Sequence, residues 1–166
     1  EGYRLKRLIV TADDFGGTTA INEAVEKGHA KGILTSASLM VSAPATEDAV
    51  ARARTLPGLN VGLHLVLVDA TPTLPRAEVP DLVDANGAFA TQLARAGWRF
   101  FFNPTVRRQL AAEIHAQFQA FAATGLRLDH VNAHHHMHLH PTVADLIVSI
   151  GRDFGLTAVR VPDEPP

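Results

Sequence analysis

Short apolar runs alternate with longer segments of helical periodicity along this chain, and this alternation restricts its fold more than any other feature. Strand-length runs alternate with segments whose apolar residues fall on one face, such as 19–31, which Gly32 ends. Such alternation is typical of parallel βα units, so we expect an α/β fold with a parallel sheet. The expected strands are 8–12, 33–42, 61–68, 126–133 and 157–161, and the expected helices are 19–31, 46–56, 104–124 and 141–154.

Composition excludes several classes of protein. The 166 residues are 46% hydrophobic, enough for one sizeable core but too few for two full domains. A formal net charge of −2 provides no basic field to hold nucleic acid, so we expect no such partner. No apolar run approaches the roughly 18 residues that span a bilayer, and no signal-peptide core is visible. We therefore expect no transmembrane segment and a cytoplasmic protein.

One segment, 69–103, breaks the βα rhythm and is interpreted as a long insertion loop. It holds three prolines, an Asn86-Gly87 turn and the aromatic group Trp98, Phe100, Phe101 and Phe102. Loops of this length are usually functional or disordered. The aromatic residues could pack the insertion onto the sheet, or they could form an apolar lip that contacts substrate.

Polar side chains stand at the carboxyl ends of three expected strands, where a parallel α/β fold places its active site. Asp13 and Asp14 follow the first strand, and His64 interrupts the third. Six of the nine histidines lie between His130 and His140, where the fourth strand ends. We therefore expect these three groups to meet in one site.

Each group also has a simpler interpretation. The aspartates could cap the next helix, although neighbouring carboxylates repel unless a cation or a shared proton compensates. His64 could be a core histidine bonded to the backbone, and the histidine cluster a solvated loop. Six imidazoles in eleven residues would, however, be costly to bury without partners. A metal ion bound by one aspartate, with the other free to accept a proton from water, accounts for all three groups.

The histidine run offers several candidate ligands. If the chain stays extended there, His134, His136 and His138 share one face and His135 lies on the other. One carboxylate and two neutral imidazoles leave coordination positions open, which is the arrangement of a catalytic site. Because the chain has no cysteine, the ligands must be nitrogen and oxygen atoms. Such ligands suit Zn, Mn, Fe or Ni and tolerate Mg, so they do not identify the ion.

Three motifs carry a resemblance to a known family. They read Thr-Ala-Asp-Asp-Phe-Gly at 11–16, Gly-Leu-His-Leu at 62–65, and His-Val-Asn-Ala-His-His-His-Met-His at 130–138. In order and spacing they resemble the YdjC-like (ChbG-type) carbohydrate deacetylases, most of all the hopanoid biosynthesis branch (HpnK-like). The resemblance implies a (β/α) barrel-like fold. It also implies metal-dependent removal of an acetyl group from an N-acetylglucosamine-containing glycan or glycolipid, which in that branch is hopanoid-linked.

The resemblance also implies roles for single residues. Asp14, His64 and His134 would bind one divalent metal ion, Mg or Zn, and Asp13 would be the catalytic base that takes a proton from the attacking, metal-activated water. The leaving amine also needs a proton, which His136 or His138 could give, although the family's late His-Pro motif is absent here. The residues expected to contact substrate are Phe15, Trp98, His130 and Arg160.

The length of the chain qualifies this interpretation. A closed barrel normally needs about 250 residues, so we expect 1–166 to be a single deacetylase domain that is truncated at its C-terminus. It would form the N-terminal two-thirds of the family's domain. Two alternatives stay open: another metal-dependent hydrolase on the same barrel, such as a phosphoesterase or amidohydrolase, or a truncated, inactive domain that binds metal or sugar. A homodimer is an open alternative for the assembly.

Overall fold

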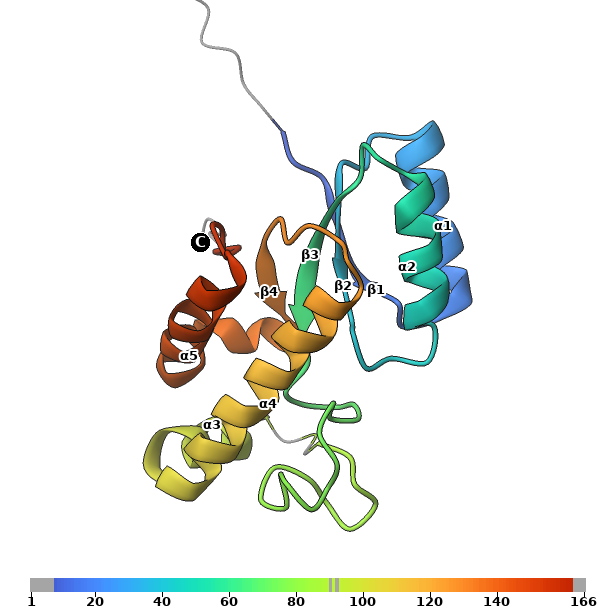
Figure 1. Ribbon diagram of the computed structural model, residues 1–166. Helices are drawn as coiled ribbons and strands as arrows, with labels where there is room; N and C mark the ends of the chain where they lie inside the picture. The colour runs from blue at the N-terminus through green and yellow to red at the C-terminus, as the bar shows by residue number, and fades with distance from the viewer. Residues whose placement is uncertain (1–7, 90, 92, 163–166) are drawn as a thin grey trace, which may run out of the picture.

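Four parallel strands form the centre of the molecule, paired in the order β1-β2-β3-β4 (Figure 1). The computed structural model describes residues 8–89, 91 and 93–162. The strands are β1 (Thr11–Phe15), β2 (Ser36–Leu39), β3 (Asn60–Leu65) and β4 (Val131–Ala133). The α-helices are α1 (Thr19–Lys31), α2 (Thr46–Thr55), α3 (Leu93–Phe102), α4 (Pro104–Ala123) and α5 (Pro141–Gly151), and the 3-10 helices are η1 (His134–Leu139) and η2 (Arg152–Phe154).

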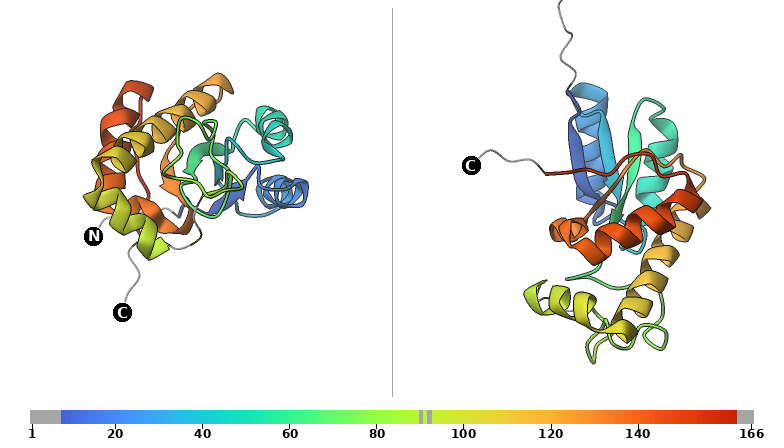
Figure 2. Two further views of the ribbon diagram at one scale, coloured as in Figure 1. Left: turned by 90° about the horizontal axis from the view of Figure 1, so that it is seen from below. Right: turned by 90° about the vertical axis from the view of Figure 1, so that its left-hand side faces the viewer.

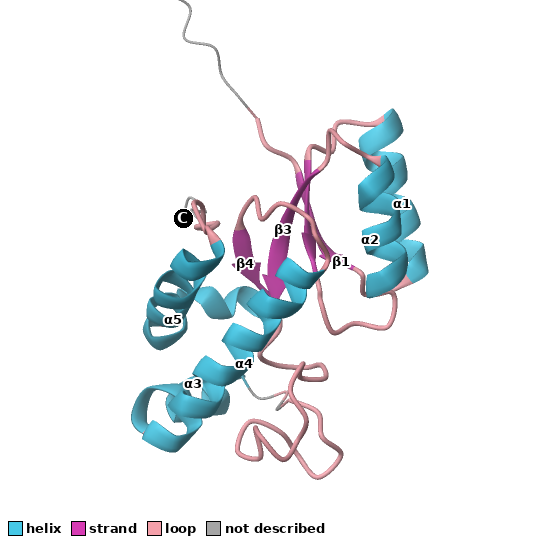
Figure 3. Cartoon of the chain, viewed as in Figure 1, coloured by secondary structure: helices cyan, strands magenta, loops and turns pink. Residues whose placement is uncertain are grey.

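The two faces of the sheet differ in polarity because side chains alternate along each strand. Leu39, Leu63 and Val131 are register neighbours on the buried apolar face. The helices lie on the outer side of the sheet, with α1 and α2 beside β1 and β2, and α4 and α5 beside β3 and β4 (Figures 1 and 3). His64 and its register partner Asn132 lie on the opposite, inner face. The inner face therefore collects the polar residues of the strands.

The sheet curves as the wall of a barrel does. Neighbouring strands lie about 4.8 Å apart, so β1 and β4 would be about 14 Å apart in a flat sheet. Yet the Asn132 side-chain amide on β4 donates to Asp13 Oδ1 on β1 at 2.8 Å. Arg160, beyond β4, reaches the same carboxylate at 2.8 Å. The expected α/β fold with parallel strands and a barrel-like wall is confirmed.

Local sequence signals explain where two of the helices begin. α1 follows Thr18, whose hydroxyl accepts a hydrogen bond from the Ile21 N–H at 3.2 Å, and α4 follows Asn103 with Pro104 at its first position. Thr46 is the first residue of α2, as expected, and its hydroxyl donates to backbone carbonyls that precede the helix, those of Met40 and Ala43.

Several expected elements differ from the structure. The fourth strand begins at Val131 instead of residue 126, and the expected strand at 157–161 amounts to one bridge between Val159 and Val131. β1 extends through the two aspartates instead of ending before them. The insertion 69–103 is only partly a loop, because its last ten residues before Asn103 form α3. Residues 90 and 92 of that insertion lie outside the described residues.

The insertion 69–103 lies at the carboxyl ends of the strands. Viewed from below, the segment after β3 crosses in front of the sheet, and α3 lies beside it (Figure 2, left). Buried polar side chains of α4 fix the start of this segment: the Gln117 amide bonds both the N–H and the carbonyl of Val66, and Glu113 accepts from the N–H groups of Thr73 and Leu74. Within the described part of the chain, no helix is both long and apolar enough to cross a membrane.

Candidate metal centre

An irregularity in β1 brings both aspartates to the inner face. Strict alternation would place only Asp13 there and would turn Asp14 toward the helices. The register with β2 shifts between Ala12 and Phe15, and Asp14 adopts a left-handed backbone with φ of 59°. The extra residue of a β-bulge re-aims a side chain in this way. Asp14 therefore reaches the inner face beside Asp13.

Asp14, His64 and His134 present three ligand atoms to one point. Asp14 Oδ1 lies 3.1 Å from His64 Nε2 and 3.1 Å from His134 Nδ1, and the two nitrogens are 3.3 Å apart. Metal–ligand distances of about 2.1 Å place adjacent ligand atoms about 3.0 Å apart in an octahedral site and about 3.4 Å apart in a tetrahedral one. The triangle fits a divalent cation with two nitrogen ligands and one oxygen ligand. The three residues expected as ligands thus form a possible metal-binding group.

Two further side chains orient the His64 ring. Asn132 uses its amide nitrogen to donate to the Asp13 carboxylate, so its oxygen faces His64 Nδ1, at 2.7 Å. We therefore assign the proton of the neutral ring to Nδ1, which leaves the Nε2 lone pair directed at Asp14 and His134. Ser38 Oγ also lies near Nδ1, at 3.2 Å. This is the tautomer that a metal ligand at Nε2 requires.

Burial favours the same neutral form. The His64 side chain is only 2% exposed. Burial lowers the pKa of His64 below its usual value, although the hydrogen bond to Asn132 and the charges of Asp13 and Asp14 oppose this shift. A neutral imidazole is the form that binds metal. The ring is thus held ready for a cation without first losing a proton.

Asp13 is held by four hydrogen bonds. Its Oδ1 accepts from Ser38 Oγ at 2.9 Å, from Asn132 Nδ2 at 2.8 Å and from one Arg160 nitrogen at 2.8 Å, while Oδ2 accepts from the other Arg160 nitrogen at 2.8 Å. Burial alone would raise the pKa of this carboxyl, but the hydrogen bonds from Arg160 and Ser38 and the nearby His64 lower it to about 2. Asp13 is therefore ionised, and a lone pair on Oδ2 remains free of the donors that the structure describes.

The histidine run is not extended as expected. His134 to Leu139 form η1, in which His135 and His136 have left-handed φ values of 52° and 55°. His134 alone of the run turns into the candidate centre. His136 is exposed, whereas His138 is 4% exposed. The Ala133 N–H donates to His138 Nδ1 at 3.1 Å, so His138 ties η1 to the end of β4.

Backbone strain gathers around the same place. Among the described residues, the non-glycine residues with positive φ are Asp14, Asp69, His135 and His136. Each left-handed conformation costs of order 1–3 kcal/mol and persists only where the surroundings enforce it. Asp69 and His135 also form, with His134, a second and more exposed group that could hold a cation. Strain and ligand-type side chains therefore coincide at one end of the sheet.

The four residues expected to contact substrate lie in different parts of the structure. Arg160 lies in the site, but its guanidinium is paired with Asp13. Phe15 does not face the site: it is fully buried on the helix-covered face, opposite Leu39. His130 precedes β4 at the far end of the strand, where it contacts Asp129 Oδ2 at 3.0 Å and packs against Gly62. Trp98 is exposed on α3.

Two residues of the site, Ser38 and Asn132, were not expected from the sequence. The position of Asn132 could have been inferred, because it lies on the expected strand two residues before His134, and alternation would place both side chains on the same face. Ser38 gave almost no such indication, because a serine in a short strand is ordinary. A third missed residue is Asn22, which is fully buried on α1 and accepts a hydrogen bond from the Gly16 N–H at 2.7 Å. It fixes the turn that follows the two aspartates.

Comparison with known proteins finds relatives across nearly the whole chain. Residues 7–166 match the family described as YdjC-like protein. A relative from Brevibacillus brevis, described as a carbohydrate deacetylase, is 36% identical over 156 residues, which are 94% of this chain and 59% of that protein. One from Geobacillus stearothermophilus with the same description is 37% identical, over 89% of this chain and 57% of that protein.

A solved structure agrees with these relatives. It comes from Enterococcus faecalis V583, from a protein to which cellobiose-phosphate cleavage has been ascribed. It superposes with a TM-score of 0.76 at 32% identity and covers 90% of this chain and 57% of that one. The chain thus spans less than two-thirds of the length of each of these relatives.

Proposed function

The chain belongs to the YdjC-like protein family, and from this premise we propose that it provides the metal site of a carbohydrate N-deacetylase. The observation that carries the proposal is the triangle of Asp14 Oδ1, His64 Nε2 and His134 Nδ1, with the ionised Asp13 beside it. Relatives described as carbohydrate deacetylases support the choice of reaction. The finer proposal, from the motifs, is an N-acetylglucosamine glycan or glycolipid, hopanoid-linked if the chain belongs to the HpnK-like branch.

The candidate ligands would hold one divalent cation, Mg or Zn. Such an ion, when bound, polarises the acetamide carbonyl and increases the acidity of water. The chain's own residues supply the remaining chemistry. Burial keeps the His64 ring neutral, and the Asn132 side-chain oxygen accepts a hydrogen bond from Nδ1–H, which leaves Nε2 toward the ion. The bulge in β1 turns the Asp14 carboxylate to the inner face, where its negative charge would attract the cation.

Proton transfer is assigned to two side chains. Asp13 Oδ2 keeps a free lone pair and accepts the proton of the attacking water, while Arg160 fixes the direction of the carboxylate. His136 is the better candidate for the acid that protonates the leaving amine, because it is exposed and lies two residues after His134 in η1. His138 is buried, and its Nδ1 is occupied by the Ala133 N–H, so we give it a structural role.

The test is acetate release from N-acetylglucosamine oligomers by metal-loaded protein. We expect release by the wild type and release at background level by His64→Ala and Asp13→Asn. His115→Ala is the matched control, because His115 is exposed on α4 and lies outside the site. Metal binding measured by calorimetry on the same variants separates loss of the ion from loss of the base: His64→Ala should lose the ion, and Asp13→Asn should keep it. Wild-type protein that binds metal yet releases no acetate from any N-acetylated sugar would contradict the proposal.

One observation favours a second candidate function. The group formed by Asp69, His134 and His135 could hold another cation, and two-metal sites are typical of phosphoesterases and amidohydrolases. The same calorimetric titration decides between the two. One equivalent of metal per chain supports the deacetylase proposal, and two equivalents that fall to one in Asp69→Asn support the alternative.

A further inference from the structure

A second group of ligand-type side chains borders the candidate metal centre. Asp69 is the first residue of the insertion that follows β3, and His135 comes directly after His134 in η1. One ligand atom each from Asp69, His134 and His135 lies within 4.8 Å of the other two. We call these three residues the outer group. Because it shares His134 with the centre, the two groups adjoin.

The outer group is more exposed to solvent than the centre. The exposed fraction of the side chain is 54% for Asp69 and 42% for His135, but 22% for His134 and 2% for His64. Asp69 Oδ2 and His135 Nε2 are 3.7 Å apart, too long for a hydrogen bond, and neither side chain bonds another described residue. A cation that approaches from this side therefore meets Asp69 and His135 before it meets His64.

The spacing of the ligand atoms makes the centre the stronger of the two sites. Its three atoms are 3.1–3.3 Å apart, which matches the spacing of about 3.0–3.4 Å around a divalent cation. The 3.7 Å between Asp69 Oδ2 and His135 Nε2 is wider than this. Solvent around the outer group also screens the charge of its carboxylate. A cation should therefore be held loosely by the outer group and firmly by the centre.

His134 cannot serve both groups at once. A neutral imidazole offers a metal one nitrogen lone pair, because its other nitrogen carries the proton. The centre needs that lone pair on Nδ1, which lies 3.1 Å from Asp14 Oδ1. A cation bound to His134 in the outer group would occupy the lone pair that the centre requires. The two groups are therefore successive positions for one ion.

We propose that Asp69 and His135 form an entry site, which captures the divalent cation from solvent and passes it through His134 to the centre. The proposal rests on the proposed function, because it requires the metal centre, and it adds the route by which that centre is loaded. Asp69 attracts the cation by its charge, and His135 offers a nitrogen ligand on the way. Asp14, whose side chain is 40% exposed, offers the competing route directly from solvent.

An entry site changes the rates of metal binding and release but not the equilibrium between them. Asp69→Asn and His135→Asn remove the carboxylate and the imidazole. Asparagine tolerates the left-handed backbone of both residues, whose φ values are 54° and 52°. In the double variant, at 0.15 M salt, the rate constants for Zn²⁺ binding and release should both fall at least about fivefold, and Kd should stay within about twofold of the wild-type value.

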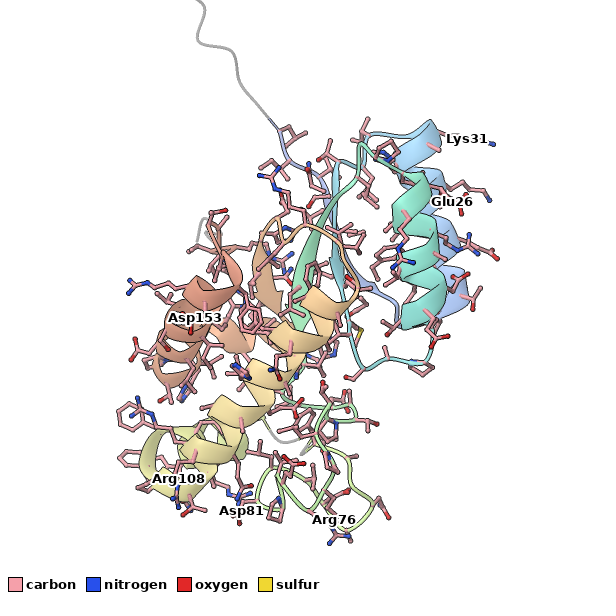
Figure 4. All side chains as sticks on the ribbon, in the orientation of Figure 1. Glu26, Lys31, Arg76, Asp81, Arg108 and Asp153 are labelled. Atoms are coloured by element: carbon pink, nitrogen blue, oxygen red, sulfur yellow. The ribbon has the colours of Figure 1, made fainter. Side chains whose placement is uncertain are left out.

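Stopped-flow mixing measures both rate constants. Binding is followed with a fluorescent zinc indicator, and release is followed after mixing with excess chelator, extrapolated to zero chelator concentration. Asp153→Asn is the matched control, because it removes the same charge from an exposed residue of η2, at the end of α5 away from η1 (Figure 4). This control should load and release Zn²⁺ as the wild type does. His135→Asn alone changes no charge and should slow both steps equally.

Three results would overturn the entry site. Wild-type rates in the double variant would mean that the ion enters directly past Asp14. Slower binding with unchanged release would mean that Asp69 and His135 contribute to the final affinity and are not merely passed on the way. Two equivalents of Zn²⁺ per wild-type chain at saturation would mean that the outer group is a permanent second site.

Acetate release separates this proposal from the proposed function. A protein that loads Zn²⁺ as predicted but releases no acetate from any N-acetylated sugar contradicts the deacetylase alone. A protein that releases acetate but loads at the same rate without Asp69 and His135 contradicts the entry site alone. Absence of Zn²⁺ from the centre would overturn both.

Discussion

Removal of the Asn132 side chain should weaken metal binding, although Asn132 is not itself a candidate ligand. The fully buried amide bonds His64 Nδ1 at 2.7 Å and Asp13 Oδ1 at 2.8 Å. Without it, His64 keeps only the longer contact to Ser38, and its tautomer and ring orientation are less well fixed. Loss of such an outer partner typically costs 10–100-fold in metal affinity, or about 1.4–2.7 kcal/mol.

The same variant should also be less stable. One lost hydrogen bond involves a neutral ring and contributes about 1 kcal/mol, and the other involves a carboxylate and contributes about 1.5–3 kcal/mol. We therefore expect Asn132→Ala to lower the free energy of unfolding by about 2–4 kcal/mol. Urea denaturation followed by circular dichroism measures this quantity, and Zn²⁺ competition against a chelator measures the affinity.

Asn60→Ala is the matched control, because Asn60 is exposed at the start of β3 and its side chain only donates to the Thr35 carbonyl at 3.3 Å. Should Asn132→Ala fail to fold, Ser38→Ala removes the weaker contact to the same ring and should reduce the affinity several-fold. A folded Asn132→Ala protein that binds Zn²⁺ as tightly as the wild type would refute the idea that Asn132 prepares His64 for the metal.

Two other expectations concern stability. Gln117→Leu should lower the free energy of unfolding by about 2–5 kcal/mol, because both backbone groups of the buried Val66 lose their partner. Gln119→Leu, at an exposed residue of the same helix, should change the free energy little. Equal urea midpoints for the two variants would count against a stabilising role of Gln117. Because the pKa of Asp13 falls from 3.8 to about 2 on folding, its ionisation stabilises the fold above pH 3.8, and this contribution is lost as the pH falls toward 2. Arg160→Met should raise the folded-state pKa, so its urea midpoint should depend less on pH between 2 and 4 than that of the wild type; identical slopes would argue against Arg160 as a main cause of the shift.

The grouping of the site's side chains can be predicted from the sequence, whereas the local backbone conformation that positions them cannot. The polar groups at the three strand ends were expected to meet, and Asp13, Asp14, His64 and His134 do lie together at one end of the sheet. Alternation cannot place Asp14, because the bulge that turns it inward depends on pairing with β2 and on the turn held by Asn22. The left-handed conformation of His135 and His136 in η1 could not be predicted either, because the segment contains no glycine to indicate positive φ.

Residues assigned by motif alone were less predictable. Phe15 follows the two aspartates in the motif, and strict alternation would turn it to the inner face; the bulge turns it instead to the helix-covered face, where it is fully buried. His130 opens the histidine motif, but β4 carries it to the opposite end from His134. Arg160 was expected near substrate, whereas curvature of the sheet brings its guanidinium onto Asp13. These outcomes depend on register and curvature, which arise only when distant segments pair.

Anomalous diffraction from crystals of the zinc-loaded protein would locate the ion relative to the three candidate ligands. We expect a strong peak within bonding distance, about 2.1 Å, of Asp14 Oδ1, His64 Nε2 and His134 Nδ1, and no such peak in His64→Ala. A zinc ion bound elsewhere, or a peak at this position that survives the loss of His64, would contradict the proposed metal centre.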